Sequence, residues 1–242
     1  MGRPMGSLPI AGGALKTPAW QSLEPLGDQG VLVRFATEEK ALAWATAARA
    51  TLPHEVVPAY RAVAVFAPLA DWEDGHLTER LAAIVPAKGG IAGRLIEIPC
   101  CYELGPDLGE CAESLKMTTQ EMARLHSSVD YQVFAIGFVP GFPYMGWLPE
   151  PIAGLDRLPS PRTRVPAGSV GITGRQTGIY PAEVPGGWRL IGKTPCPLAD
   201  LTEGEFGWFA LAPGDRVRFR PLPEIEFDRL AGCRPTVLEP LS

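Results

Sequence analysis

Six basic residues lie between positions 157 and 193, and Glu183 is the one acidic residue among them. The whole chain has a net charge of −5, so this local excess of positive charge stands apart from the overall composition. Guanidinium groups form paired hydrogen bonds with carboxylate and phosphate oxygens. The segment therefore predicts either a binding site for a small anion or a solvated loop surface. The six residues are Arg157, Arg162, Arg164, Arg175, Arg189 and Lys193.

Neutral polar side chains on the same segment add donors and acceptors that suit a polar, amide-like ligand. We expect Arg162 and Arg164, with Lys193 as a further cation, to bind a carboxylate or phosphoryl oxygen of that ligand. The neutral side chains would then orient its amide group. These neutral residues are Ser169, Thr173, Gln176 and Tyr180.

Two residues are candidates for proton transfer, Glu183 and His126. Glu183 is the only carboxylate within the basic segment, and its alternative role is an ion pair with a neighbouring arginine. His126 closes a predicted helix, where a histidine can transfer a proton or interact favourably with the helix C-terminus. Both alternatives stay open for each residue.

A stretch rich in aromatic residues and proline precedes the basic segment, from 138 to 147. Pro140, Phe142 and Tyr144 are predicted to form a pocket wall. The alternatives are packing in the hydrophobic core and a surface that binds a partner protein.

Other motifs are excluded by their context. Residues 187–194 match the phosphate-loop pattern, but Pro195 and Pro197 follow at once and prevent the helix that such a loop requires. Residues 167–171 approach a nucleophile elbow, yet Ala167 replaces its first glycine. The five cysteines have no CxxC spacing, so we predict neither a metal site nor a disulfide framework and expect reduced thiols.

Composition limits the class of protein further. The chain is 46% apolar and 20% charged, which is typical of a soluble globular protein. Acidic residues outnumber basic residues, 27 to 22, which argues against binding to nucleic acid or to an anionic membrane. No apolar run is long enough for a membrane span and no secretion signal is evident, so we expect a cytoplasmic location.

The first part of the chain alternates between predicted strands and helices. Thr37 is expected to cap a helix that runs to Ala50, with Glu38 and Glu39 in its first turn. This order predicts a small α+β domain over 18–95, with helices on one sheet face, after a mobile tail over 1–17. The other expected elements are strands at 23–26, 31–35, 55–60, 62–66 and 94–98, and a helix at 74–85.

The second part, 96–242, is predicted to be mostly sheet. After two helices, the second with a capping box at Thr118–Glu121, a strand is expected over 131–138. Between 137 and 197 there are 11 Gly and 11 Pro, which interrupt any long helix. Strands at 169–173 and 188–191, and a closing hairpin of 206–211 with 216–220, predict a loop-decorated β-barrel or sandwich.

Several of these motifs together resemble one protein family. The matching segments are Gly137–Tyr144, Arg164–Ile172, Gln176–Pro181 and Pro185–Trp188, with further matches at 57–61, 105–108 and 213–219. They resemble the family variously named 5-oxoprolinase B subunit, kinase A inhibitor (KipI) and allophanate hydrolase subunit 1. One local departure is 197–200, where the family usually has Leu-Phe-Asp.

The resemblance implies a small α+β domain followed by a cyclophilin-like β-barrel domain. It implies a partner that is the C subunit (KipA-type), itself cyclophilin-like, and a third subunit. In that family the assembly opens 5-oxoproline to glutamate with ATP, so this chain would supply half of an active site and be nearly inactive alone. Whether ATP contacts this chain is left open.

Two other functions are consistent with the resemblance. One is regulatory, the inhibition of a sensor histidine kinase through an apolar surface. The other is the carboxyltransferase or allophanate hydrolase-type half of a urea amidolyase system. A third idea, prolyl isomerase activity, rests on the barrel type alone, and a shared fold does not carry an activity.

Overall fold

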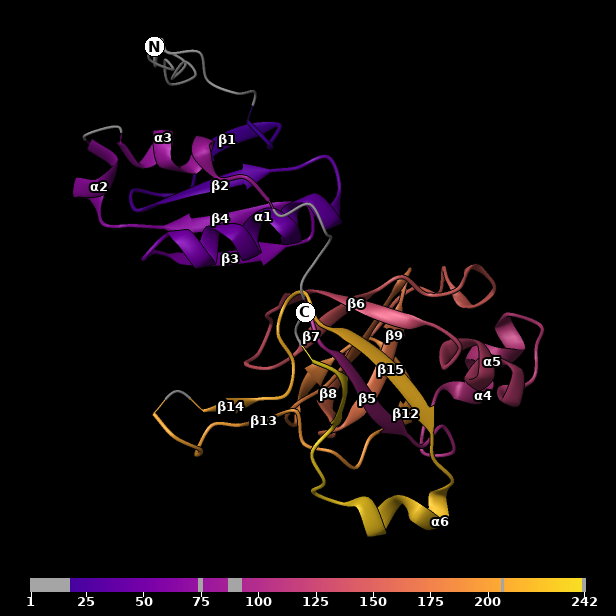
Figure 1. Ribbon diagram of the computed structural model, residues 1–242. Helices are drawn as coiled ribbons and strands as arrows, with labels where there is room; N and C mark the ends of the chain where they lie inside the picture. Colours follow the sequence, from indigo (N-terminus) through magenta and orange to yellow (C-terminus); the bar gives the residue numbers. More distant parts are fainter. Residues whose placement is uncertain (1–17, 74–75, 87–92, 206, 241–242) are drawn as a thin grey trace.

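The computed structural model describes residues 18–73, 76–86, 93–205 and 207–240, so the expected tail over 1–17 lies outside the described residues. The first sheet has the order β1-β2-β4-β3, with all neighbours antiparallel (Figure 1). Its strands are β1 (Ser22–Pro25), β2 (Gly30–Arg34), β3 (Glu55–Ala59) and β4 (Ala62–Phe66). These bounds confirm the four strands expected in this region.

Helices cover one face of this sheet. Helix α1 (Glu38–Thr51) begins where expected, because the Thr37 hydroxyl accepts a hydrogen bond from the backbone amide of Lys40. The expected helix at 74–85 is α3 (His76–Ala83), preceded by a short α2 (Leu69–Glu73). Alternate strand residues such as Val63 and Val65 are fully buried against α1 and α3, which forms the first hydrophobic core.

The second sheet has eight strands in the order β12-β9-β10-β7-β6-β15-β5-β16. The sheet curls enough for a single bridge, between Cys101 and Lys193, to join the end of β5 to the end of β12. The two strands do not otherwise pair, so in the described residues the sheet is not a closed barrel. The strands are β5 (Leu95–Cys100), β6 (Asp130–Ile136), β7 (Pro143–Gly146), β9 (Ser169–Thr173), β10 (Gln176–Ile179), β12 (Arg189–Lys193), β15 (Arg216–Pro221) and β16 (Thr236–Glu239).

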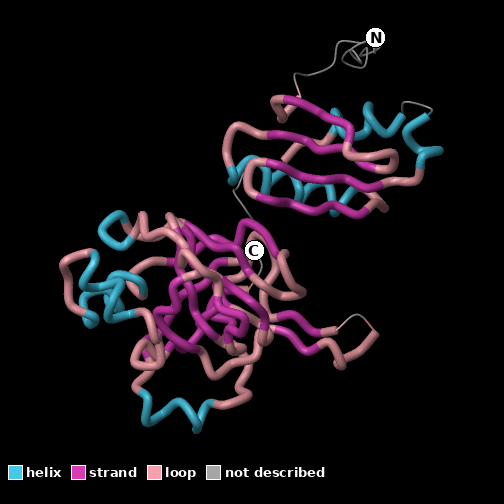
Figure 2. Tube along the Cα trace, turned by 180° about the vertical axis from the view of Figure 1, so that it is seen from behind, coloured by secondary structure: helices cyan, strands magenta, loops and turns pink. Residues whose placement is uncertain are grey.

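Smaller elements surround the second sheet, and the whole is a mixed α+β structure that is mostly sheet (Figure 2). Helices α4 and α5 lie beside each other at one end of the sheet, while β13 and β14 project from it. None of the described helices is long and apolar enough to cross a membrane. These elements are α4 (Leu108–Ser114), α5 (Thr119–His126), η1 (Glu150–Ile152), β8 (Arg162–Val165), β11 (Val184–Gly186), β13 (Ala199–Asp200), β14 (Trp208–Phe209), α6 (Glu224–Phe227) and η2 (Asp228–Leu230).

Two expected pairings are wrong. The strand expected at 94–98, as the last strand of the first part of the chain, is β5, and it lies instead in the second sheet, parallel to β15. The expected closing hairpin does not form, because β14 pairs with β13 while β15 pairs with β5 and β6. Val217 and Phe219 on β15 are buried in the second core, and only a central position in the large sheet can cover them.

The capping box at the start of α5 gives a first testable prediction. The Thr118 hydroxyl accepts a hydrogen bond of 3.1 Å from the backbone amide of Glu121. We expect Thr118→Ala to lower the free energy of unfolding by about 1 kcal/mol, since one amide at the helix start loses its partner. Urea unfolding measures this. Thr119→Ala is the control, because the Thr119 hydroxyl donates to the neighbouring Gln120 side chain and not to the helix backbone. Equal losses of unfolding free energy in both variants would contradict the capping role of Thr118.

Candidate functional site

A two-residue turn places polar groups at one end of the second sheet. Strands β9 and β10 pair so that Thr173 lies opposite Gln176, and Gly174 and Arg175 form the turn between them. Gly174 has a φ of +54°, a conformation that glycine adopts without strain and that tight hairpins require. The hairpin tip therefore presents Thr173, Arg175 and Gln176 together.

A neighbouring loop and strand complete a hollow of about 580 Å³ around this tip. Trp147 follows β7, which pairs with β10. The loop that carries Asp156 and Arg157 is held to the turn by the amide of Gly174, which donates to Leu155, and by the amide of Gly154, which donates to Gly174. The lining residues are Trp147, Asp156, Arg157, Thr173, Gly174, Arg175 and Gln176.

The hollow carries unpaired positive charge. Within the described part of the chain, neither Arg157 nor Arg175 has a carboxylate within ion-pair distance. The Arg175 guanidinium lies 5.3 Å from the centre of the Trp147 ring, which holds it by a cation–π contact. Both arginines and Asp156 are exposed, so the hollow opens to solvent. Its groups can bind a small anion that also offers an amide.

Tyr60 reaches this region from the first sheet. It lies in the turn between β3 and β4 with a φ of +56°, an uncommon conformation for a residue with a side chain. Its hydroxyl accepts a hydrogen bond from the Gln176 side chain, and its ring stacks on Trp147 at 6.2 Å between centroids. Burial raises the pKa of Tyr60 well above its ordinary value, which keeps the hydroxyl neutral. The first sheet therefore helps to position two residues of the hollow.

Arg162 does not line the hollow. Its Nη2 donates a 2.6 Å hydrogen bond to Asp107, whose other carboxylate oxygen accepts from the backbone amide of Leu190 at 2.6 Å. Asp107 is 5% exposed. Because this ion pair ties β8 to the start of α4 and to β12, Arg162 acts here as a structural residue.

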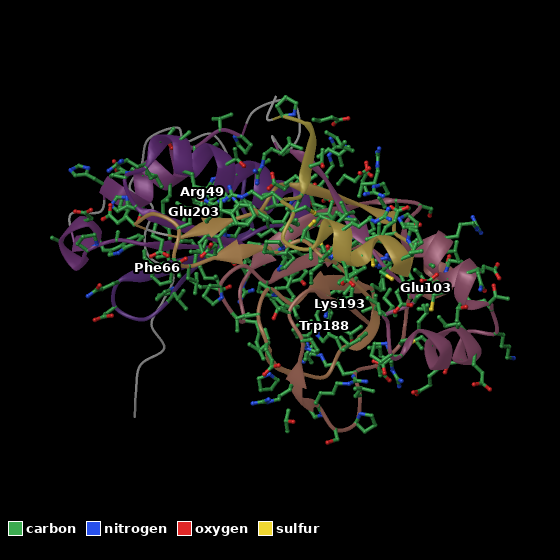
Figure 3. All side chains as sticks on the ribbon, turned by 90° about the horizontal axis from the view of Figure 1, so that it is seen from below. Arg49, Phe66, Glu103, Trp188, Lys193 and Glu203 are labelled. Carbon is green, nitrogen blue, oxygen red and sulfur yellow. The ribbon has the colours of Figure 1, made fainter. Side chains whose placement is uncertain are left out.

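Arg164, Glu183 and Lys193 also lie outside the hollow. Arg164 forms an exposed ion pair with Glu183 at 3.5 Å, the alternative role that the sequence left open for this carboxylate. Lys193, labelled in Figure 3, ends β12. Its Nζ lies 5.7 Å from the centre of the Phe227 ring. None of the three is among the residues that line the hollow.

The residues expected to form a pocket wall pack mainly into an aromatic cluster. Phe142 and Tyr180 are 1% exposed, and the Phe142 ring contacts both Tyr180 and Trp188. Tyr144 is half-buried and Pro140 is exposed. Burial raises the pKa of Tyr180, whose expected role was to orient an amide. None of the three residues expected to form the wall is among the residues that line the hollow.

The Ser169 hydroxyl already has a partner within the protein, because it donates a 2.7 Å hydrogen bond to the Pro166 carbonyl. Of the seven polar or charged residues expected to bind substrate, the structure brings Thr173 and Gln176 to the hollow.

His126 is a core residue, with no exposed surface. The hydroxyl of Thr177 donates to the Gly171 carbonyl, so Nε2 of His126 must donate to Thr177 at 2.9 Å. Nδ1 therefore accepts from the Tyr102 hydroxyl at 2.8 Å. Burial lowers the pKa of His126 to about 3. The neutral imidazole joins α5 to β10 and lies outside the hollow, so we do not assign it the proton-transfer role.

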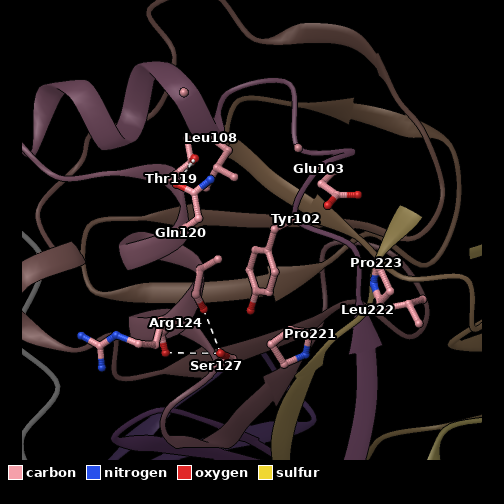
Figure 4. A pocket seen from close by; sticks show the side chains of 13 residues that line it. Tyr102, Glu103, Leu108, Thr119, Gln120, Arg124, Ser127, Pro221, Leu222 and Pro223 are labelled. Carbon is pink, nitrogen blue, oxygen red and sulfur yellow. Dashed lines mark hydrogen bonds between the residues drawn. The ribbon is translucent and has the colours of Figure 1, made fainter. Parts of the chain in front are cut away.

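A larger cavity, of about 770 Å³, lies elsewhere, between α4, α5 and the end of β15 (Figure 4). Three of its polar groups already have partners. The Tyr102 hydroxyl binds His126, the Ser127 hydroxyl donates to Ala123, and Glu103 accepts from the backbone amide of Glu224. Arg124 also lines this cavity, with no carboxylate at ion-pair distance among the described residues. Volume favours this cavity, but the smaller hollow holds two such arginines, Arg157 and Arg175, and this higher charge favours it as the site for an anion.

The described residues form neither a metal centre nor a phosphate loop. In the described ranges, no group of three or more His, Cys, Asp or Glu side chains is arranged to hold a metal ion. The phosphate-loop pattern at 187–194 contains strand β12, which pairs with β9. It therefore does not form the loop and helix that hold phosphates.

Arg157 and Arg175 belong to the basic segment that the sequence indicated as a possible anion site, and Trp147 ends the aromatic stretch, but the sequence did not select these residues or Tyr60 for individual roles. A signal for Arg175 was available, since Gly174 and Arg175 separate two segments with strand character. Tyr60 lies in the matching segment 57–61, but no local pattern shows that it contacts Gln176, 116 positions away.

Known proteins share this fold and much of this sequence. Residues 21–208 match the family described as carboxyltransferase domain, subdomain C and D. The 5-oxoprolinase B subunit of Bacillus subtilis (strain 168) is 37% identical over 231 residues, covering 85% of this chain and 94% of that protein. The crystal structure of TTHA0988 has a TM-score of 0.71 at 36% identity. That match covers 80% of this chain but 40% of that chain.

The fold and the matched region define a protein of the carboxyltransferase-domain class. Within that class, the chain belongs to the family of the 5-oxoprolinase B subunit. The K. lactis urea amidolyase shares the fold, with a TM-score of 0.68 at 18% identity over 99% of this chain and 18% of that chain.

Proposed function

We propose that this chain is the B subunit of an ATP-dependent 5-oxoprolinase, with the arginine-bearing hollow as its part of the active site. The observation that carries this proposal is the combination of two unpaired guanidinium groups with Thr173 and Gln176 in one hollow. The name of the Bacillus subtilis relative, which is 37% identical, supports the choice of reaction.

The chemistry of 5-oxoproline matches these groups. The molecule is a five-membered lactam that carries one carboxylate. Arg157 and Arg175 would bind the carboxylate by charge-assisted hydrogen bonds. Thr173 and Gln176 would hydrogen-bond to the lactam N–H and C=O, which holds the ring in one orientation for opening to glutamate.

The hollow is incomplete for catalysis by itself. Asp156 is the only carboxylate among the described residues that line it, and it is exposed. We propose that the second, sheet-rich part of the chain is a cyclophilin-like domain and that a KipA-type partner, the C subunit, covers the open side. In this arrangement a third subunit and ATP complete the enzyme, and the isolated chain is nearly inactive.

Replacing Arg175 tests the site. We expect Arg175→Ala to lower kcat/KM of the assembled complex for 5-oxoproline at least about tenfold, since a charge-assisted hydrogen bond is lost. The measurement is glutamate release by the co-expressed subunits, with and without ATP.

Arg164→Ala is the matched control. Arg164 was expected from the sequence to bind substrate, but it pairs with Glu183 on an exposed surface, so its loss should change kcat/KM less than about twofold. Complex formation is checked by size-exclusion chromatography. An Arg175→Ala complex that assembles and turns over at the unsubstituted rate removes this hollow from the active site.

A second candidate function is the carboxyltransferase half of a urea amidolyase system. Two observations favour it, the carboxyltransferase description of the matched family and the fold shared with the K. lactis urea amidolyase. The same hollow would then bind a different small planar amide. Assaying the assembled complex with urea and with allophanate in place of 5-oxoproline separates the two functions.

A further inference from the structure

Two thiols from distant parts of the chain lie almost in bonding contact. The Sγ atoms of Cys196 and Cys233 are 2.6 Å apart, although the residues are 37 positions apart in the sequence. Cys196 is buried in the loop that follows β12, and Cys233 is half-buried in the segment that follows η2. A disulfide bond has about 2.0 Å between its sulfurs, so bond formation would bring these two atoms closer by roughly half an ångström.

The backbone holds both cysteines in this position. The amide of Gly232 donates a 3.0 Å hydrogen bond to the Pro195 carbonyl, which joins the residues that precede the two cysteines. The amide of Cys196 donates to the Thr194 hydroxyl at 3.2 Å, and the amide of Cys233 donates to the Leu230 carbonyl at 3.0 Å. The approach of the two sulfurs is therefore built into the loops that carry them.

The segment that carries Cys233 has few other attachments to the protein. We call residues 228–240 the C-terminal strap. No residue of η2 or β16 within it is buried. It is held by the pairing of β16 with β5, by the Arg234 guanidinium 4.3 Å from the Trp208 ring centroid, and by exposed ion pairs of Arg234 with Glu203 and of Glu239 with Arg216. Exposed ion pairs contribute little stability.

We propose that Cys196 and Cys233 form a reversible disulfide that fastens the C-terminal strap to the end of β12. This site is separate from the arginine-bearing hollow and does not depend on the proposed enzymatic reaction. It also replaces the expectation that all five cysteines are purely structural thiols.

The oxidant we propose is a small-molecule disulfide such as oxidised glutathione. Cys233 attacks first, because it is the more accessible of the two and burial raises the pKa of the Cys196 thiol. Its thiolate forms a mixed disulfide and releases one glutathione thiol. The Cys196 sulfur then attacks the Cys233 sulfur, loses its proton and releases the second glutathione thiol. Two protein thiols are oxidised and one small disulfide is reduced.

The other cysteines serve as internal controls. Cys100, Cys101 and Cys111 are buried, and within the described residues none of them has another cysteine sulfur at hydrogen-bond distance. Burial raises the pKa of the Cys111 thiol to about 11, which suppresses its reactivity. We therefore expect these three to stay reduced when the native protein meets oxidised glutathione.

The test counts free thiols in the full chain. After incubation with oxidised glutathione, the protein is denatured, alkylated and weighed by mass spectrometry. We expect five alkylated cysteines to fall to three, and a tryptic disulfide-linked pair of peptides 194–216 and 230–242 to appear. Five alkylated cysteines after oxidation, or a linkage that includes Cys100, Cys101 or Cys111, would overturn the proposal.

A second measurement tests the fastening of the strap. The oxidised protein should melt about 5 °C higher than the reduced protein, because the cross-link restricts the unfolded chain. It should also resist proteolysis within 228–240, because the disulfide attaches the strap to the folded protein. Cys233→Ser should show neither difference after the same treatment. A disulfide that forms without changing the melting temperature or the cleavage of the strap would refute its fastening role.

Discussion

The Asp215→Ala variant is expected to lose about 3 kcal/mol of unfolding free energy, the cost of leaving a largely buried arginine without its carboxylate. The Asp215 side chain is 4% exposed and that of Arg94 is 29% exposed. Its carboxylate accepts hydrogen bonds from the Arg94 backbone amide at 2.9 Å, from Arg94 Nη2 at 2.5 Å and from the Ala212 amide at 2.9 Å.

The position of the Asp215 carboxylate explains why its loss should also weaken the pairing of β5 with β15. Arg94 directly precedes β5 and Asp215 directly precedes β15, so the ion pair fixes the register of the two parallel strands at their start. Parallel strands cannot be joined by a short turn, and a side-chain contact at the point of entry replaces the alignment that a hairpin would supply.

Chemical unfolding of Asp215→Ala beside Glu239→Ala provides the comparison. Glu239 also pairs with an arginine of β15, Arg216, but its side chain is 58% exposed. We expect its removal to cost less than about 1 kcal/mol. Equal losses in the two variants would show that burial does not decide the strength of these ion pairs.

His126 should make the protein unstable in acid. Burial holds its pKa at about 3 in the folded state, whereas the unfolded chain titrates near the ordinary value of 6.5. Below that ordinary value the unfolded state therefore binds a proton that the folded state does not. The contribution of the neutral His126 to the unfolding free energy is fully present above about pH 6.5. It falls by about 1.4 kcal/mol per pH unit as the pH drops toward 3. At about pH 4.5 the loss from this residue is about 3 kcal/mol.

Unfolding curves between about pH 7.5 and 4.5 measure this loss, with His76→Gln as the control, because His76 is on an exposed helix surface. The contribution of His126 should be present in the His76→Gln control and absent from His126→Gln. Should His126→Gln not fold, the imidazole nitrogens of the unsubstituted protein can be followed by NMR. A His126 ring that protonates in the folded protein near its ordinary pKa of 6.5 would disprove the prediction.

Tyr60, in the turn between β3 and β4, connects the first sheet to the hollow. Tyr60 stacks on Trp147 and accepts a hydrogen bond from Gln176, so it orders two lining residues by contact from outside the second sheet. Its uncommon backbone conformation is consistent with this positioning role, since such strain persists only where the surroundings compensate for it. The two parts of the chain are thus coupled at the candidate site.

The sequence by itself determined the local elements and the chemical character of the site. Helix α1 and helix α5 begin at Thr37 and Thr118 as predicted, because a cap is decided by residues within one turn. Two of the six basic residues between 157 and 193, Arg157 and Arg175, line the hollow, and the motifs between 137 and 188 correctly indicated the family.

Only the tertiary structure decided which arginines share the hollow. Arg157 and Arg175 come together because the loop at 154–155 pairs with the β9–β10 turn, whereas Arg162 is drawn to Asp107, 55 positions earlier. The pairing of β15 with β5 is equally non-local, and the sequence instead predicted, wrongly, that 216–220 forms a hairpin with 206–211. Such contacts depend on which strands become neighbours, and the free energy of that choice comes from burying whole sheet faces, which no short stretch of sequence encodes.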